Sequence, residues 1–185
     1  MDAETPDRAQ LPLWQAYPYM FEGPARVVAV DAEGGVILDR SLFYPAGGGQ
    51  PGDTGVLEVA GRTIAVADAR KAEGGVRLVL AEGETPPEAA VVQRLDEGRR
   101  RAHMRMHTAL HLLSVVIPLP VTGGQIGADK GRLDFDMPEA PGDREALEAQ
   151  LNALVEANHP VTDEWITDAE LEANPGLVKT MAVKP

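Results

Sequence analysis

Short runs of β-branched and aliphatic residues, separated by glycine-containing turns, fill the chain from about residue 25 to residue 92. This pattern predicts strands at residues 26–30, 36–38, 56–59, 62–67 and 76–80, with another beginning at residue 91. The breaks between them are expected at residues 33–35, 61, 68 and 73–75. Residues 1–19, with three prolines, are expected to be irregular. Short strands at such regular spacing predict a small antiparallel β-barrel or sandwich.

The hydrophobic period changes near residue 96, and helices dominate from there. The pattern predicts a helix over residues 97–116, ended by Pro118 and Pro120, and a second over residues 143–158. Residues 122–127 indicate a glycine-rich turn and residues 131–137 a half-buried strand. Thr167 and Glu170 have the spacing of a capping box for a short third helix, which residues 174–176 end. We therefore predict an α+β protein with a barrel domain at residues 1–92 and an α+β domain at residues 93–185.

Composition narrows the possible chemistry. With 44% hydrophobic residues the chain has enough apolar material for a core, and with no cysteine it has neither disulfides nor thiol ligands. A metal site would have to use His, Asp or Glu. No stretch approaches the roughly 20 apolar residues of a membrane span, and the acidic N-terminus lacks a secretion pattern. We expect a cytoplasmic protein with no membrane partner.

The net charge of −12 argues against nucleic-acid binding, but the charge is unevenly distributed. Residues 94–132 carry seven Lys or Arg and three acidic residues. Residues 133–185 carry three Lys or Arg and twelve acidic residues. A local basic segment fits a brief contact with RNA. On charge alone, a solvated helix start with a few salt bridges is the favoured interpretation.

Three of the four histidines lie at positions 103, 107 and 111. Spacing by four places neighbours on one face of a helix, where His107 and His111 can bind one metal ion from the same side. Two ligands do not complete a zinc site, and polar or buried structural histidines remain the alternative.

Residues 43–52 (FYPAGGGQPG) form the most unusual local sequence. Three successive glycines allow positive φ angles and close approach of the backbone to a ligand, and their amides can form an anion-binding concavity. A wide turn or bulge in the barrel explains them equally well. Gln125, on the second glycine-rich segment, is placed to hydrogen-bond a substrate or a water, and Arg132 and Asp134 are expected to pair on one side of their strand.

Four segments, in order, resemble the editing domain of alanyl-tRNA synthetases. They are residues 42–55 (LFYPAGGGQPGDTG), 100–113 (RRAHMRMHTALHLL), 132–136 (RLDFD) and 174–181 (NPGLVKTM). The chain looks closest to the free-standing AlaX-type trans-editing proteins, over about residues 24–185. The resemblance implies a barrel like that of translation proteins, followed by the second additional domain shared by threonyl- and alanyl-tRNA synthetases.

The resemblance also implies a reaction, hydrolysis of the ester that joins serine or glycine to alanine tRNA, and a set of site residues. His107 and His111 match the family's first pair of zinc ligands. Thr108 and Gln125 are the candidate catalytic residues, although a threonine often found before the second histidine is Leu110 here. The candidate substrate-binding residues are Gly47, Gly48, Gly49, Gln50 and Arg105.

The family completes its zinc site with a Cys and a His, four apart, after the segment that matches residues 177–181. This sequence ends at Pro185 and has no cysteine, so we expect an α+β domain incomplete at its C-terminus and half a zinc site.

The expected function is that of an aminoacyl-tRNA deacylase, a carboxylic ester hydrolase that acts on Ser- or Gly-tRNA(Ala) with tRNA, and not DNA, as its partner. One alternative is a non-catalytic remnant that binds RNA or another partner. The missing Cys-His segment favours that alternative, and the retained histidine pair weighs against it. A hydrolase of a small aminoacyl ester is the third possibility.

Overall fold

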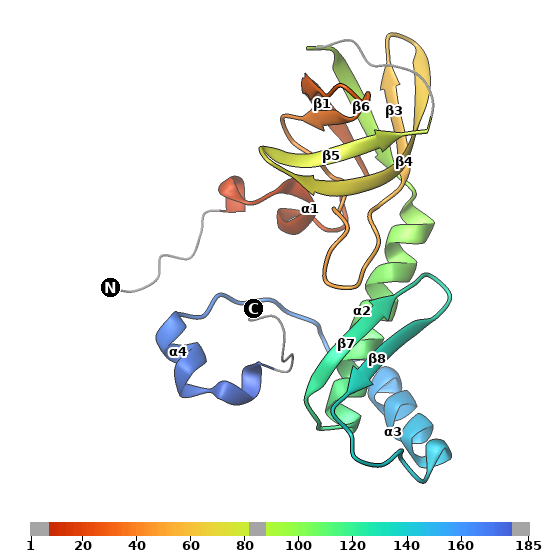
Figure 1. Ribbon diagram of the computed structural model, residues 1–185, viewed down its shortest axis with the longest axis vertical. Helices are drawn as coiled ribbons and strands as arrows, with labels where there is room; N and C mark the ends of the chain where they lie inside the picture. The colour runs from red at the N-terminus through yellow and green to blue at the C-terminus, as the bar shows by residue number, and fades with distance from the viewer. Residues whose placement is uncertain (1–7, 82–87, 179–185) are drawn as a thin grey trace. The chain divides into compact units, whose positions relative to one another are not determined.

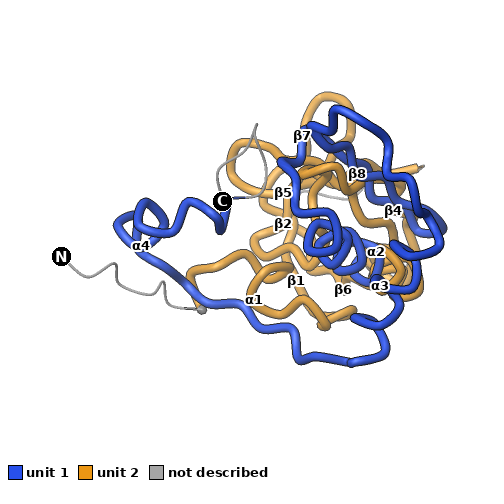
Figure 2. The backbone as a smooth tube through the Cα atoms, turned by 90° about the horizontal axis from the view of Figure 1, so that it is seen from below, with its two compact units in different colours: residues 1–5, 104–185 blue, residues 6–103 orange. Residues whose placement is uncertain are grey.

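The computed structural model describes residues 8–81 and 88–178 of the 185-residue chain. The described residues divide into two compact units, the first ending at His103 and the second beginning at Met104 (Figure 2). This division falls inside one continuous helix, α2 (Glu97–Val116), whose bounds match the predicted helix. The first two turns of α2 therefore belong to the barrel unit, and the remaining turns belong to the second unit.

Six strands close into an antiparallel barrel in the first unit (Figure 1). They are β1 (Glu22–Val30), β2 (Val36–Leu38), β3 (Gly55–Val59), β4 (Arg62–Ala72), β5 (Gly75–Leu80) and β6 (Ala90–Leu95), in the spatial order β1-β2-β5-β4-β3-β6. Every neighbouring pair is antiparallel, which confirms the predicted barrel. Closure pairs each strand on both sides, so that strands as short as β2 persist without an open edge.

The barrel interior is almost entirely aliphatic. In β4, Ile64 and Val66 are buried between exposed neighbours, as the two-residue period of a strand requires. The next buried residue, Ala69, follows after three positions because the register shifts between Val66 and Asp68. Burial of each large apolar side chain contributes about 1.5–3 kcal/mol, which makes it the main stabilising term in a chain without cysteine. The buried core residues are Val27, Val36, Leu38, Leu42, Phe43, Leu57, Val59, Ile64, Val66, Ala69, Val76, Leu78, Val91 and Leu95.

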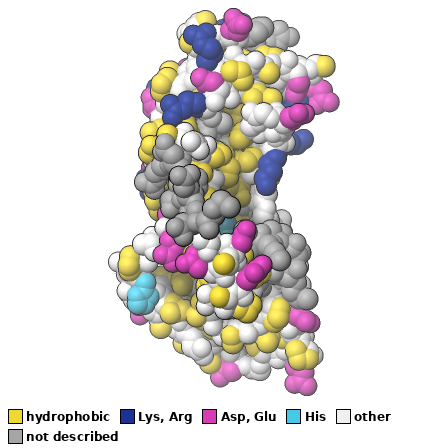
Figure 3. All heavy atoms as spheres, turned by 90° about the vertical axis from the view of Figure 1, so that its left-hand side faces the viewer, with side chains coloured by type: hydrophobic (Ala, Val, Ile, Leu, Met, Phe, Trp, Pro, Cys, Tyr) yellow, Lys and Arg dark blue, Asp and Glu magenta, His cyan; other side chains and the backbone are white. Residues whose placement is uncertain are grey.

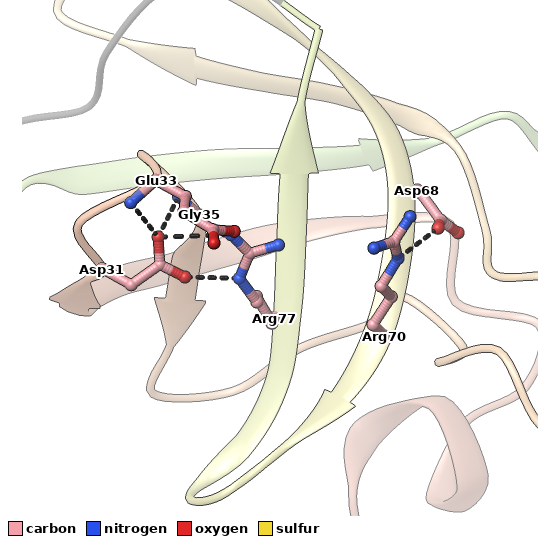
Figure 4. Close-up of polar contacts among 6 residues, drawn as sticks. All are labelled: Asp31, Glu33, Gly35, Asp68, Arg70 and Arg77. Carbon is pink, nitrogen blue, oxygen red and sulfur yellow. Dashed lines mark hydrogen bonds and ion pairs between the residues drawn. The ribbon is translucent and has the colours of Figure 1, made fainter.

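The predicted break at Asp68 is wrong, because β4 continues through it to Ala72. The pairing of β4 with β5 shifts register between Val66 and Asp68, which is the signature of a β-bulge. The Asp68 carboxylate accepts a hydrogen bond from Ala69 N at 2.9 Å. It accepts a second one from Arg70 Nε at 2.8 Å (Figure 4). The bulge thus accommodates a polar residue without ending the strand.

A second polar cluster fixes the turn between β1 and β2. The Asp31 carboxylate accepts hydrogen bonds from the Glu33 and Gly35 amides and pairs with Arg77 of β5 (Figure 4). The hydrogen bond from Arg77 and the bond from Gly35 lower the pKa of Asp31 to about 2. The turn predicted at residues 33–35 is therefore held by side chains as well as by glycine.

The lead-in predicted as irregular is partly helical within its described residues. It contains a 3-10 turn, η1 (Arg8–Gln10), and one turn of helix, α1 (Leu13–Ala16). Ala16 is buried, and Leu13 and Trp14 pack against the barrel core. Tertiary burial, which local sequence does not reveal, stabilises this short helix.

The second unit consists of most of α2, a hairpin of β7 (Val121–Ile126) and β8 (Gly131–Phe135), α3 (Arg144–Glu156), α4 (Asp168–Ala173) and the 3-10 turn η2 (Pro175–Leu177). The hairpin packs on α2, since a Cβ placed on Gly131 would lie 2.8 Å from Met106 Sδ. The predicted capping box at Thr167 and Glu170 is present. The observed barrel and the α+β unit after it confirm the predicted fold class.

A turn is predicted at residues 122–127, but residues 122–126 instead form most of strand β7. Gly123 and Gly124 do not adopt positive φ angles. A Cβ on Gly124 would lie 3.0 Å from the Arg132 carbonyl oxygen, so glycine here permits close approach of the two strands. Arg132 and Asp134 pair on β8 as predicted, with 3.0 Å between Nε and Oδ1.

On one face of the molecule, the charged side chains are distributed differently over the two units. On the face shown in Figure 3, the Lys and Arg side chains gather over the barrel unit, whereas acidic side chains appear over both.

Within the described ranges, α3 and α4 contain no buried residue. None of the described helices has both the length and the apolar character needed to cross a membrane.

Candidate functional site

The glycine-rich loop between β2 and β3 contains a tight hairpin turn at residues 47–50. Gly47 N donates to the Gln50 carbonyl and Gln50 N donates to the Gly47 carbonyl, both at 3.0 Å. Between them, Gly48 and Gly49 have φ angles of +59° and +79°, the pair of left-handed conformations that a type I′ turn requires. Both corner glycines are exposed, so a ligand can reach the peptide groups of the turn. Gln50 is 6% exposed and lies at the base of the turn.

Buried contacts hold the start and end of this loop against the barrel. Gln93 of β6 is fully buried, and its Oε1 accepts a hydrogen bond from Leu42 N at 2.9 Å. Its Nε2 donates to the Arg40 carbonyl at 2.9 Å. A Cβ on Gly52 would lie 2.1 Å from the Ala69 carbonyl oxygen, so only glycine fits where the loop crosses β4.

Asp53 and Arg100 form an ion pair beneath the loop, with exposed fractions of 1% and 3%. Arg100 Nε donates to Asp53 Oδ2 at 2.8 Å, and the two Nη groups donate to the carbonyls of Pro18 and Leu42 at 2.9 and 2.7 Å. Asp53 Oδ2 also accepts a hydrogen bond from Tyr44 N at 2.7 Å. One arginine at the start of α2 therefore ties the helix to both the loop and the N-terminal segment.

His107 and His111 lie one turn apart on α2, with their rings stacked at a centroid distance of 4.9 Å. His107 is half-buried and His111 is exposed. Burial, and then the neighbouring His111, lower the pKa of His107 below its usual 6.5. The imidazole of His107 is therefore mostly neutral at pH 7, which is the form that binds a metal.

The described ranges do not bring a third His, Cys, Asp or Glu to this histidine pair. Zinc sites in proteins use three or four protein ligands. The pair has the right donor chemistry for zinc, but the residues described here do not complete a zinc site.

The remaining predicted site residues lie on α2 and on the hairpin. Thr108 follows His107, and its hydroxyl donates to the Met104 carbonyl at 3.0 Å. Gln125 is exposed on β7, opposite Arg132 of β8, and Arg105 is exposed on α2. The second unit thus carries both candidate zinc ligands, both candidate catalytic residues and Arg105, whereas the glycine-rich turn belongs to the barrel unit.

Arginines of the predicted basic segment mostly serve the fold. Arg100 is buried and cannot contact a phosphate. Arg94 pairs with Glu22 and Glu58 across the barrel strands. Arg101 pairs with Glu97 at 2.7 Å, and its guanidinium lies 4.8 Å from the ring centroid of Phe21. Arg94 and Arg101 would have to exchange these partners to bind RNA.

Lys71 of β4 approaches the glycine-rich turn, although no sequence pattern predicted a role for it. A Cβ on Gly47 would lie 3.1 Å from Lys71 Cε and 3.4 Å from its Nζ. The loop folds back onto β4 through a hydrogen bond of 2.8 Å from Ala46 N to the Ala69 carbonyl, which brings the exposed lysine beside it. Lys71 could be identified only from the contact between the loop and β4, because it belongs to no local motif.

His103 is the third histidine of α2 and belongs to the barrel unit. It is 1% exposed, and within the described part of the chain its Nδ1 has no hydrogen-bond partner. Burial, followed by the positive charge of Arg99, lowers the pKa of His103 below 6.5. The folded protein therefore holds this imidazole neutral.

Stability is accordingly expected to fall as the pH is lowered through about 6.5. The unfolded chain binds a proton at His103 near pH 6.5, whereas the folded chain does not, because its His103 has a lower pKa. The stability present above pH 6.5 is therefore lost as the pH falls toward the pKa of His103 in the folded protein. Thermal melting should show a flatter pH profile for His103→Gln than for the wild type. His159→Gln, at an exposed histidine, should keep the wild-type profile. Parallel profiles for His103→Gln and the wild type would contradict a neutral buried His103.

Comparison with known proteins gives one family model and several close relatives. The model for class II (A) tRNA synthetases matches residues 20–99. The alanyl-tRNA editing protein AlaX-M of Methanosarcina mazei is 35% identical over 177 residues, which cover 89% of this chain and 70% of that protein. AlaX-M of Methanosarcina acetivorans is 34% identical over 89% of this chain and 72% of its own length.

The alanine–tRNA ligase of Thermococcus kodakarensis is 36% identical over 174 residues, which cover 89% of this chain and 19% of the ligase. The chain thus spans about a fifth of the length of this ligase and about seven tenths of the AlaX-M proteins.

Proposed function

The chain belongs to the alanyl-tRNA editing family of the AlaX-M proteins and the matching part of alanine–tRNA ligases, and we propose that it is a trans-editing deacylase. Its substrates would be Ser-tRNA(Ala) or Gly-tRNA(Ala), and the bond hydrolysed would be the ester between the wrong amino acid and the tRNA. The main support for the proposal is the similarity to AlaX-M over 89% of the chain. The retained His107 and His111 support it.

In this proposal, the chain contributes hydrogen-bond donors and positioning groups. The amides of Gly48 and Gly49 at the exposed turn are suited to bind an oxygen of the substrate. The exposed Gln125 would orient a water or the ester carbonyl. The Thr108 hydroxyl already donates to Met104, so it would act on substrate or water as an acceptor.

We propose zinc as the cofactor, held by His107 and His111 together with ligands from beyond the described residues. When bound, zinc would supply Lewis-acid polarisation and orientation of the aminoacyl group. Burial of His107 supports this role, since it keeps the imidazole in the form that binds metal.

Discrimination against alanine is the demanding part of this reaction. Serine differs from alanine by a single hydroxyl group. A site that hydrogen-bonds this hydroxyl rejects the substrate that lacks it much more strongly than an apolar pocket rejects an extra group. The polar groups of the residue 47–50 turn are the proposed partners of the serine hydroxyl.

Lys71 is the proposed phosphate contact beside the glycine-rich turn. Lys71→Met should weaken binding of alanine tRNA and reduce the slope of log K against log salt by about 1, because one phosphate contact is lost. Titration of the tRNA at several salt concentrations measures both effects. Arg62→Met removes an exposed cation from the other end of β4 and should leave the slope unchanged. Identical slopes for Lys71→Met and the wild type would exclude the contact.

Comparing the hydrolysis of serine attached to tRNA with that of serine in a small ester separates the three candidate functions. The editing proposal predicts hydrolysis of Ser-tRNA(Ala) and little hydrolysis of serine ethyl ester at equal concentration. Equally efficient hydrolysis of the free ester would favour a small-ester hydrolase. Binding of the tRNA without hydrolysis of either substrate, in zinc-supplemented buffer, would favour the non-catalytic remnant.

A further inference from the structure

The side chain of Tyr44 reaches the carbonyl that closes the glycine-rich turn. Tyr44 Oη donates to the Gly47 carbonyl oxygen at 3.0 Å. The same oxygen accepts the hydrogen bond from Gln50 N that completes the hairpin. A Cβ on Gly48 would lie 3.9 Å from the Tyr44 hydroxyl, so the phenol lies alongside the corner of the turn.

Tyr44 is itself fixed by both its ring and its backbone. Trp14 packs edge to face on the ring, with centroids 5.2 Å apart and planes at 83°. The backbone of Tyr44 exchanges hydrogen bonds with Asp53, from Tyr44 N to Asp53 Oδ2 at 2.7 Å and from Asp53 N to the Tyr44 carbonyl at 3.0 Å. Asp53 is held in turn by the buried Arg100. A continuous set of contacts therefore runs from the start of α2 to the tip of the loop.

The Tyr44 hydroxyl remains a donor under working conditions. Burial, followed by the negative charge of Asp53, raises the pKa of Tyr44 above its usual 10.0. The phenol is therefore protonated at physiological pH and keeps its hydrogen bond to Gly47.

We propose that Tyr44 is a positioning residue of the editing site, which fixes the Gly48–Gly49 turn so that its peptide groups meet the serine hydroxyl. The inference rests on the proposed editing function. A turn closed by two backbone hydrogen bonds at an exposed loop tip can move as a rigid unit. The Tyr44 hydroxyl connects this turn to the buried ion pair of Asp53 and Arg100. Since misplacement of a substrate contact by about 1 Å can cost roughly 100-fold in rate, fixing this turn matters for discrimination.

Tyr44→Phe is the test, because it removes the hydroxyl and keeps the ring that packs on Trp14. We expect kcat/KM for Ser-tRNA(Ala) to fall roughly 10- to 100-fold, with little change for Ala-tRNA(Ala), so that the ratio between the two falls. The melting temperature should stay within a few degrees of the wild-type value. Tyr19→Phe, at a tyrosine that is 67% exposed, is the matched control and should change neither quantity.

Hydrogen exchange gives a second readout that does not depend on activity. The Gly47 and Gln50 amides should exchange faster in Tyr44→Phe than in the wild type and in Tyr19→Phe. A wild-type serine-to-alanine ratio, or wild-type exchange at these amides, in a folded Tyr44→Phe protein would overturn the inference. If neither the wild-type chain nor any longer form that its gene encodes hydrolyses mischarged tRNA, the proposed function fails instead, and the exchange rates still test whether Tyr44 fixes the turn.

Discussion

Replacement of Arg100 by Met is expected to lower the free energy of unfolding by about 3–5 kcal/mol, since it leaves the Asp53 carboxylate buried without its cation. Both side chains of the pair are almost fully buried, at 3% and 1% exposure. The substitution also removes the donors to the Pro18 and Leu42 carbonyls. The free energy of unfolding of a small domain is only about 5–15 kcal/mol, so this single change should remove a large part of it.

Urea unfolding of Arg100→Met beside Arg101→Met measures this effect. Arg101 is the next residue of α2, but its pair with Glu97 is about half exposed, and its loss should cost less than about 1 kcal/mol. In the double variant Arg100→Met, Asp53→Asn the buried charge is gone, so part of the loss should be recovered. Equal losses for Arg100→Met and Arg101→Met would contradict the structural role given to the buried pair.

Replacement of His107 by Asn is expected to lower kcat/KM for Ser-tRNA(Ala) by about 100-fold or more, because it removes one of the two proposed zinc ligands. His107 is only half-buried on α2, so the helix should stay folded, as circular dichroism can verify. Zinc affinity should fall in parallel. His159→Asn, outside the described helices, is the control and should retain both properties. A fully active His107→Asn protein would remove zinc from the proposed mechanism.

The elements with strong local signals were predictable from the sequence. The bounds of α2, the capping box at Thr167 and most barrel strands follow from hydrophobic period and capping chemistry, which are encoded within a few residues. The strand through Asp68 and the strand that replaced the turn at residues 122–127 were missed. In both, pairing with a neighbouring strand overrides the local preference of Asp or Gly.

The motifs of the candidate site were also predictable, whereas the groups that support them were not. His107, His111 and the residue 47–50 turn stand out because of spacing and glycine content. Lys71 reaches the turn from a strand without a motif. Arg100 lies in the basic segment of the sequence, but the folded protein buries it. These contacts depend on how the loop folds over the barrel, which no local pattern encodes.

Release of serine and of alanine from the same tRNA(Ala), measured side by side, tests most directly the proposal that this chain edits mischarged alanine tRNA. The assay should use the 185-residue chain and any longer form that its gene encodes, in zinc-supplemented buffer. We expect at least one form to release serine rapidly and to leave Ala-tRNA(Ala) largely intact. Release of neither amino acid by any form, or equal release of both, would contradict the editing function.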